Sequence, residues 1–188
     1  MDSIYEQQVG AYTARVVPDY GTYDSPRDWD NVGIMECAHR RYDLGDVRHR
    51  EAFELPADAI EPMPLYLLEH GGVRMSTGDF RDPWDSGQVG WIYTTRERLA
   101  AMGHDWTRLT ASRRARIREW LRAEVDTYDA YLAGAVYAWE VVAPSGEVVE
   151  SCGGYIGWDA DDYALSEAVG TAEAFDAENE RALALAGI

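Results

Sequence analysis

Hydrophobic runs separated by polar turns predict short strands in the first part of the chain. Residues 9–17 are rich in β-branched and aromatic side chains and end at Pro18, which is typical of a first strand. A polar loop with glycine, proline and four aspartates follows over 19–31, and the short apolar run at 32–37 predicts a second strand. We therefore expect the fold to begin with strands.

Two turn signals predict β-hairpins. Gly71 and Gly72 form a dipeptide that favours a tight turn, and Pro144-Ser145-Gly146 lies between two further apolar runs. A separate strand is expected just before a short helix at 95–102. The strands expected in this part of the chain cover residues 63–69, 72–76, 88–93, 135–142 and 147–156.

The strongest helical pattern covers residues 111–133. Thr110 or Ser112 is the candidate N-cap, and Gly134 follows the expected end of the helix. Apolar residues recur at three- and four-residue spacing, which predicts one stripe that faces the core. The members of this stripe are Ile117, Trp120, Leu121, Val125, Tyr128, Tyr131 and Leu132.

A final helix is expected to begin at Asp161 or Asp162 and to continue toward Gly187. Its apolar seam is thin because small residues form most of it, and Gly170 weakens or bends the helix. The seam contains Leu165, Ala168, Ala172, Phe175, Ala182 and Ala186.

These elements predict an α+β fold. Strands and helices interleave irregularly and short turns join adjacent strands, so we expect a mainly antiparallel sheet packed by one long amphipathic helix and an acidic C-terminal helix. We expect residues 1–158 to form the α+β domain. Residues 159–188 are expected to form the acidic helix, packed on that domain or appended to it.

The acidic charge is concentrated near the C-terminus. Residues 123–188 contain 14 acidic residues and one arginine, whereas residues 1–122 contain 20 acidic residues and 16 arginines. All 17 basic residues of the 188-residue chain are arginine. Codon bias and adaptation to salt would each produce this composition without any binding partner. Neither explains why the excess of acid lies at one end.

The sequence indicates a cytoplasmic protein. Cys37 and Cys152 are too few for a disulfide framework, and residues 1–10 lack the basic and apolar regions of a signal peptide. No stretch approaches 18 uninterrupted apolar residues, the length expected of a membrane span.

Metal, cofactor and nucleophile motifs are weak in this sequence. Ser86 lacks the G-x-S-x-G frame of a nucleophile elbow because Trp84 stands at the first glycine position. The aspartate-rich loop places His39 where a calcium-binding EF-hand needs a glutamate. The histidines lack the paired spacing of a zinc site. We expect no metal, no cofactor and no enzymatic activity.

Two Trp-Asp motifs leave an enzymatic alternative open. Paired carboxylates beside aromatic rings can perform acid and base chemistry, so a small hydrolase or transferase is the alternative to an interaction protein. A pocket that gathers both motifs would favour this alternative. Its candidate residues are Asp28, Trp29, Asp30, Trp84, Asp85, Ser86 and Gln88.

The same motifs carry a resemblance. The segments DSPRDWDN at 24–31 and WDSGQVG at 84–90, with YDAYL at 128–132 and the strand near 147–154, resemble small uncharacterised proteins of phages, plasmids and other mobile elements. The similar region extends from about residue 12 to residue 158. The resemblance implies a mobile-element origin, and accessory proteins of such elements often counter host defences, for example restriction.

Five arginines crowd the first half of the long helix, where the helix dipole disfavours positive charge. We expect them to meet the acidic C-terminal segment, since a protein of net charge −17 is repelled from nucleic acid at long range. The arginines are Arg113, Arg114, Arg116, Arg118 and Arg122.

The C-terminal acids support the leading hypothesis. Over a helix they would be spaced at about 4 Å per charge, comparable to one strand of DNA at about 3.4 Å. We therefore expect an inhibitor that occupies the basic groove of a nucleic-acid-handling host protein as a DNA mimic, without binding nucleic acid or a membrane. A solvated helix face and a virion assembly protein are the alternatives. The expected contact residues are Asp159, Asp161, Asp162, Glu167, Glu173, Asp176, Glu178 and Glu180.

Overall fold

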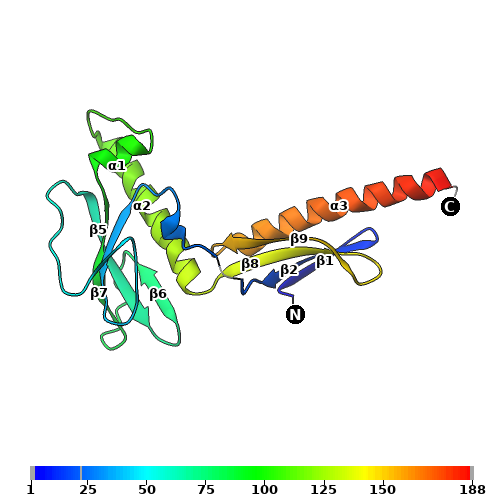
Figure 1. Ribbon diagram of the computed structural model, residues 1–188, viewed down its shortest axis with the longest axis horizontal. Coiled ribbons are helices and arrows are strands. Elements are labelled where there is room, and N and C mark those ends of the chain that lie inside the picture. The colour runs from blue at the N-terminus through cyan, green and yellow to red at the C-terminus, as the bar shows by residue number, and fades with distance from the viewer. Residues whose placement is uncertain (1–2, 22, 187–188) are drawn as a thin grey trace. The chain divides into compact units, whose positions relative to one another are not determined.

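Two sheets, each packed against its own long helix, make up the fold in a computed structural model that describes residues 3–21 and 23–186 (Figure 1). The chain divides into two compact units. Unit 1 consists of Met1–Tyr23 and Gly134–Ile188, and unit 2 consists of Asp24–Ala133. The α+β class with mainly antiparallel pairing is confirmed, but the strands form two sheets instead of one.

Unit 1 contains a four-stranded antiparallel sheet of order β1-β2-β8-β9. The strand predicted over 9–17 is in fact part of a hairpin, because Gly10 turns the chain with a φ of 56°. The Pro-Ser-Gly hairpin is confirmed between β8 and β9. The strands are β1 (Tyr5–Val9), β2 (Tyr12–Pro18), β8 (Val136–Val142) and β9 (Val148–Ile156).

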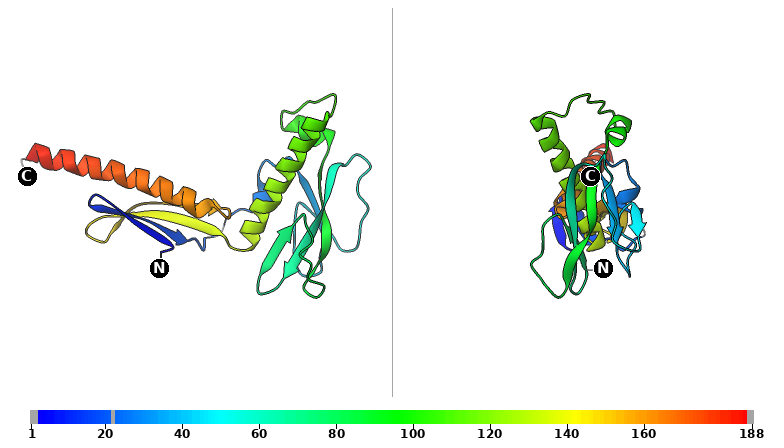
Figure 2. Two further views of the ribbon diagram at one scale, coloured as in Figure 1. Left: turned by 180° about the vertical axis from the view of Figure 1, so that it is seen from behind. Right: turned by 90° about the vertical axis from the view of Figure 1, so that its left-hand side faces the viewer.

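Helix α3 (Ala160–Ala186) lies along one face of this sheet (Figures 1 and 2). Ala164, Ala168 and Ala172 recur every four residues and are fully buried, because their small side chains allow close approach to the strands. The predicted seam is therefore confirmed in its first part. Ala182 and Ala186 are exposed instead, since α3 continues past the ends of both hairpins in the two views.

Unit 2 contains a five-stranded sheet of order β4-β3-β7-β5-β6. All pairs are antiparallel except β3 with β4. The predicted hairpin at Gly71 and Gly72 is confirmed, whereas the three-residue β4 is too short to leave a sequence pattern. The elements are η1 (Pro26–Asp28), β3 (Ile34–Ala38), β4 (Val47–His49), β5 (Ile60–Glu69), β6 (Val73–Ser76), β7 (Ser86–Thr94) and α1 (Arg96–Ala101).

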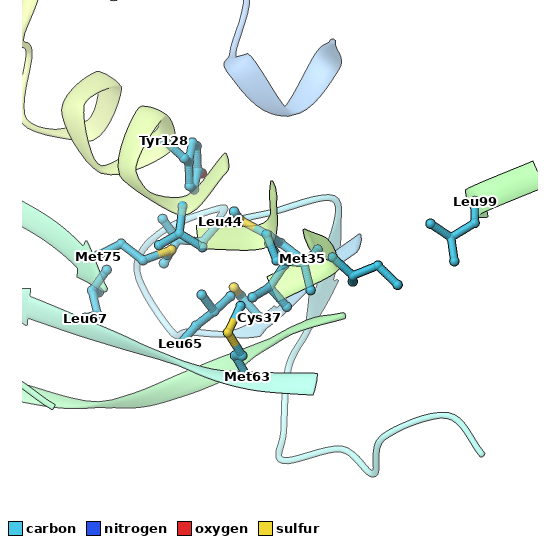
Figure 3. Packing of buried hydrophobic residues seen from close by; sticks show 13 residues of the cluster. Met35, Cys37, Leu44, Met63, Leu65, Leu67, Met75, Leu99 and Tyr128 are labelled. Carbon is cyan, nitrogen blue, oxygen red and sulfur yellow. The ribbon is translucent and has the colours of Figure 1, made fainter. Parts of the chain in front are cut away.

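Helix α2 (Ala111–Leu132) closes the core of unit 2, as its stripe predicts. Figure 3 shows Tyr128 of this helix above the cluster that contains Met35, Leu65 and Met75. The Thr110 hydroxyl accepts a hydrogen bond from the backbone N–H of Arg113 and so caps the helix, as predicted.

The division between units differs from the domain boundary expected at residue 158. Its cause is burial: the alanine seam of α3 packs on β2 and β8, so the acidic helix belongs to the core of unit 1. The second core forms within residues 24–133, around α2.

Within the described part of the chain, no helix combines the length and apolar character that crossing a bilayer requires. Helix α3 has 27 residues, which is long enough, but seven of them are acidic.

Candidate functional site

The acidic charge follows the division into units. Unit 1 contains 14 acidic residues and two arginines, a balance of −12, whereas unit 2 contains 20 acidic residues and 15 arginines, a balance of −5. Among the residues that the structure describes, a single ion pair forms in unit 1, between Arg15 and Glu140. The remaining negative charge of unit 1 is therefore not neutralised by neighbouring arginines.

Two of the eight predicted contact residues have roles inside unit 1. Asp176 is half-buried and accepts a hydrogen bond of 2.8 Å from the backbone N–H of Ala11, which ties α3 to the β1–β2 turn. Asp161 is half-buried beside Tyr5, and its negative charge raises the pKa of that tyrosine. These two carboxylates position α3 and face the sheet, so they are not part of an exposed binding face.

The other six carboxylates are exposed, and those on α3 fall into two rows. Asp162, Glu173 and Glu180 are separated by 11 and 7 residues, which are close to whole numbers of turns, so they share one side of the helix. Glu167 and Glu178 are also 11 residues apart and lie about 140° around the helix from the first row. The exposed acids of α3 therefore lie on two sides of the helix and do not share one face.

The solvent side of α3 between the two rows is not uniform. Ser166, Gly170 and Ala177 lie in this sector and are exposed, and so are Tyr163 and Arg181. The structure thus presents two lines of negative charge, with small residues, one tyrosine and one arginine between them.

Three of the α2 arginines have partners within unit 2. Arg114 and Arg118 both pair with Glu61, at the start of β5. Arg113 lies over the Trp106 ring, 5.0 Å from its centroid, and donates to the Arg108 carbonyl. The expected contact of the helix arginines with the C-terminal acids stays a prediction.

A hollow of about 740 Å³ lies in unit 2, where β3, β5 and β7 end or begin. It receives Trp84, Asp85, Ser86 and Gln88 from the second Trp-Asp motif. The other polar lining residues come from the segment after β3 and the end of β5, and they are His39, Arg40, Arg41, Arg50, Glu51 and Glu69.

His39 is held by hydrogen bonds at both ring nitrogens at the wall of this hollow. Its Nδ1 accepts hydrogen bonds from the backbone N–H groups of Arg41 and Tyr42, at 3.3 and 3.2 Å. The ring proton is therefore on Nε2, which donates to Glu69 at 3.0 Å. Both ring nitrogens are engaged, so His39 fixes the loop and does not act as a free base.

The turn before β7 is built by Asp82. Its carboxylate accepts hydrogen bonds from the backbone N–H groups of Asp85 and Trp84, which hold the pKa of Asp82 below its usual range. The Ser86 hydroxyl donates to the Asp82 carbonyl at 2.6 Å, so this serine has a structural role. The turn leaves the Trp84 side chain 90% exposed at the edge of the hollow.

The first Trp-Asp motif belongs to a different part of unit 2. Asp28, Trp29 and Asp30 lie at the end of η1 with exposed side chains and do not line the hollow. The predicted pocket is therefore wrong as a single set. The inward positions of this segment are taken by Arg27 and Asn31, which turns the residues between them toward solvent.

Arg27 and Asn31 are the residues in this motif that sequence reasoning missed. The Arg27 guanidinium, 3% exposed, binds both oxygens of Asp46 and also donates to Glu124 and the Gly33 carbonyl. Asn31 donates to the Pro26 and Trp29 carbonyls. The motif thus has a structural role, since its buried arginine and asparagine form a hydrogen-bond network. The one sequence signal for this structural role was the Ser25-Pro26 pair, because Ser25 caps the short helix that Pro26 begins.

The described residues contain no group of three or more histidine, cysteine, aspartate or glutamate side chains that would hold a metal ion. Histidines instead pair singly with carboxylates. His49 contacts Glu36 at 2.6 Å, and His70 contacts Asp85 at 2.9 Å.

No protein-family model, no curated protein and no solved structure matched this chain. The resemblance to mobile-element proteins therefore stays a prediction.

Proposed function

We propose that this protein binds and inhibits a nucleic-acid-handling partner by placing unit 1 in the partner's basic groove. The observation that carries the proposal is the set of exposed, unpaired carboxylates on and next to α3, within a unit of charge −12. Negative charge that no neighbouring arginine neutralises attracts a basic surface over long distances and increases the rate of association.

The arrangement of charge favours a polyanion-like field over an atom-by-atom copy of DNA. Neighbouring carboxylates in one row are about 10 to 16 Å apart along the helix axis, whereas successive phosphates of one DNA strand rise by about 3.4 Å along the duplex axis. A groove that accepts a duplex would therefore meet two sparse rows of charge. We expect competition with nucleic acid for the same groove, with affinity that falls as salt increases.

The class of partner follows from the chemistry of such a groove. Restriction enzymes, nucleases and repressors all bind duplex DNA through clustered lysine and arginine residues. A mobile element gains from inhibiting host proteins of this kind. The role that we propose is therefore anti-restriction, or another anti-defence role, in the host cytoplasm.

The test starts with capture of host proteins on the immobilised full chain at low salt. We expect retained proteins to bind DNA, to elute at moderate salt, and to be displaced by an added DNA duplex. Retention that neither salt nor duplex DNA reverses would contradict the proposal.

Charge-neutralising variants then locate the surface. Neutralisation of one row by Asp162→Asn, Glu173→Gln and Glu180→Gln should slow association with a captured partner by about tenfold at low salt. The matched control removes the same charge from exposed positions of unit 2, by Asp30→Asn, Glu54→Gln and Glu119→Gln. An equal loss in both variants would show that net charge matters and that α3 is not the contact surface.

A further inference from the structure

Strand β7 has an unpaired edge inside the hollow of unit 2. It pairs with β5 along most of its length, as far as Ser86 opposite Leu68. On its other side it pairs with β3 only from Tyr93 to Gly90, where Gly90 lies opposite Cys37. Within the described part of the chain, residues 86–89 of β7 therefore have a neighbouring strand on one side only. The backbone N–H of Ser86 already donates to the Asp82 carbonyl, at 3.2 Å, and the hollow lies at this end of the sheet.

The separation of the strands begins at Gly90. A Cβ at this position would lie 2.0 Å from the Glu36 carbonyl oxygen, so β3 and β7 approach more closely here than a side chain allows. One residue earlier, Val89 is an extra residue in β7 relative to β5, which is a β-bulge. Bulges bend a strand and redirect its side chains, and Val89 lines the hollow.

Two guanidinium groups stand at the hollow without a carboxylate partner. Arg41 pairs with Glu69, but neither Arg40 nor Arg50 makes an ion pair with any residue that the structure describes. Of the three carboxylates in the lining, Glu69 contacts Arg41 and His39, Asp85 contacts His70, and Glu51 makes no ion pair with any residue that the structure describes. The unpaired side chains therefore favour an occupant that carries negative charge.

Apolar surface continues from the hollow along β7. A second hollow of about 300 Å³ shares Val89 with the first and adds Phe53 and Trp91. Trp84 contributes an exposed ring at the opposite end. An apolar side chain of a bound ligand would pack against these rings and displace water from them.

We propose that this edge of β7 binds an extended acidic peptide segment of a partner protein by adding it as a strand beside residues 86–89. Backbone hydrogen bonds would hold the peptide, as in other complexes formed by strand addition. Its carboxylates would bind Arg40 and Arg50, and an alternate apolar side chain would lie against Val89. This site is separate from the α3 surface and does not depend on the function proposed for it.

The probe is a fluorescein-labelled peptide of alternating glutamate and valine, added to the full chain. We expect increased fluorescence anisotropy and slower hydrogen exchange of the backbone amides at residues 86–89. A copy of the peptide methylated on its backbone nitrogens should bind about tenfold more weakly or not at all, because it lacks the donors that a strand provides.

Two arginine variants test the charge requirement. The double variant Arg40→Ala and Arg50→Ala should weaken binding by about tenfold or more, since charge-assisted hydrogen bonds are lost. The control is Arg108→Ala with Arg116→Ala, which removes the same charge from exposed positions of unit 2 outside the hollow and should leave binding unchanged.

Three results with the peptides would overturn the proposal. They are the absence of binding and amide protection with the unmodified peptide, equal binding of the methylated copy, and equal binding of a copy with lysine in place of glutamate. Complete competition by inorganic phosphate together with unchanged amide exchange would also overturn it, because the hollow would then be a small-anion site.

Discussion

Arg27 shows how one residue organises its surroundings in unit 2. Its guanidinium is inaccessible to solvent and links η1 to the loop before β4 and to α2, through Asp46 and Glu124. Glu124 also accepts hydrogen bonds from the backbone N–H groups of Val32 and Gly33. Burial opposes the charged form, but these hydrogen bonds and charges outweigh it and raise the pKa of Arg27. Arg27 therefore stays charged at any ordinary pH.

Removing this side chain should strongly destabilise unit 2. Arg27→Ala leaves two partly buried carboxylates, Asp46 and Glu124, without their partner, so the free energy of unfolding should fall by about 3 kcal/mol, measured in urea. The control is the adjacent exposed residue: Asp28→Ala should change it by less than about 0.5 kcal/mol. Similar values for both variants would mean that the network contributes little.

The exposed His70–Asp85 pair should be visible in a pH titration. The hydrogen bond and charge of Asp85 raise the pKa of His70. We expect NMR of the imidazole to give a pKa above the ordinary value of about 6.5, and Asp85→Asn to lower it toward that value. Asp30→Asn is the control and should have no effect.

The sign of the linked stability follows from that shift. A histidine whose pKa is raised by folding stabilises the folded protein below its unfolded pKa, and this contribution is lost as the pH rises through the folded pKa. The pair is fully accessible to water, so the effect on stability should be small. An unshifted His70 in the native protein would contradict the observed contact.

Helix α3 illustrates how an element combines packing with charge. Its alanine seam allows close contact with the sheet, and the remaining circumference is left for the two acidic rows. Asp176 and the Gly10 turn fit closely, since a Cβ at Gly10 would lie 1.8 Å from the Asp176 carboxylate. The position of the rows therefore depends on the contacts of small residues.

A larger side chain in the seam should separate α3 from the sheet. Ala168→Leu should reduce the free energy of unfolding by about 1–3 kcal/mol through overpacking, and should speed hydrogen exchange along α3. Ala177→Leu introduces the same side chain at an exposed position of α3 and should be close to neutral. If the two variants behaved alike, α3 would not be held by its seam.

Local signals explain which elements were predictable. The Gly71-Gly72 turn and the Thr110 cap each act within a few residues, so their hairpin and helix follow from the sequence. Burial of Arg27 depends on residues 46 and 124, which are far away in the sequence. No local pattern identifies such partners, and the same limit explains why the two Trp-Asp motifs were wrongly joined in one pocket.

At the scale of the whole molecule, unit 2 is an insertion in unit 1. It interrupts the connection between β2 and β8, which are neighbouring antiparallel strands. The two ends of this connection remain close, because the Asp19 backbone N–H donates to the Val136 carbonyl at 2.9 Å. Sequence patterns did not predict this insertion, because the hydrophobic pattern of a strand is the same whether its partner strand is near or distant in the chain.

Each unit should fold without the other. Residues 24–133 expressed alone should retain the circular dichroism of a mixed sheet and helix, and the α2 amides should exchange slowly. A second chain, in which a short glycine-containing turn replaces residues 24–133, should form the four-stranded sheet with α3. An unfolded 24–133 fragment would show that its core needs unit 1.

The chain crosses between the units twice, near residue 23 and near residue 133. A protease that cuts once in unit 2, or at either crossing, therefore separates the segment before residue 24 from the segment after residue 133 covalently. The two segments then stay together through the pairing of β2 with β8. Degradation of this protein should thus proceed through nicked species that still carry the acidic rows of α3.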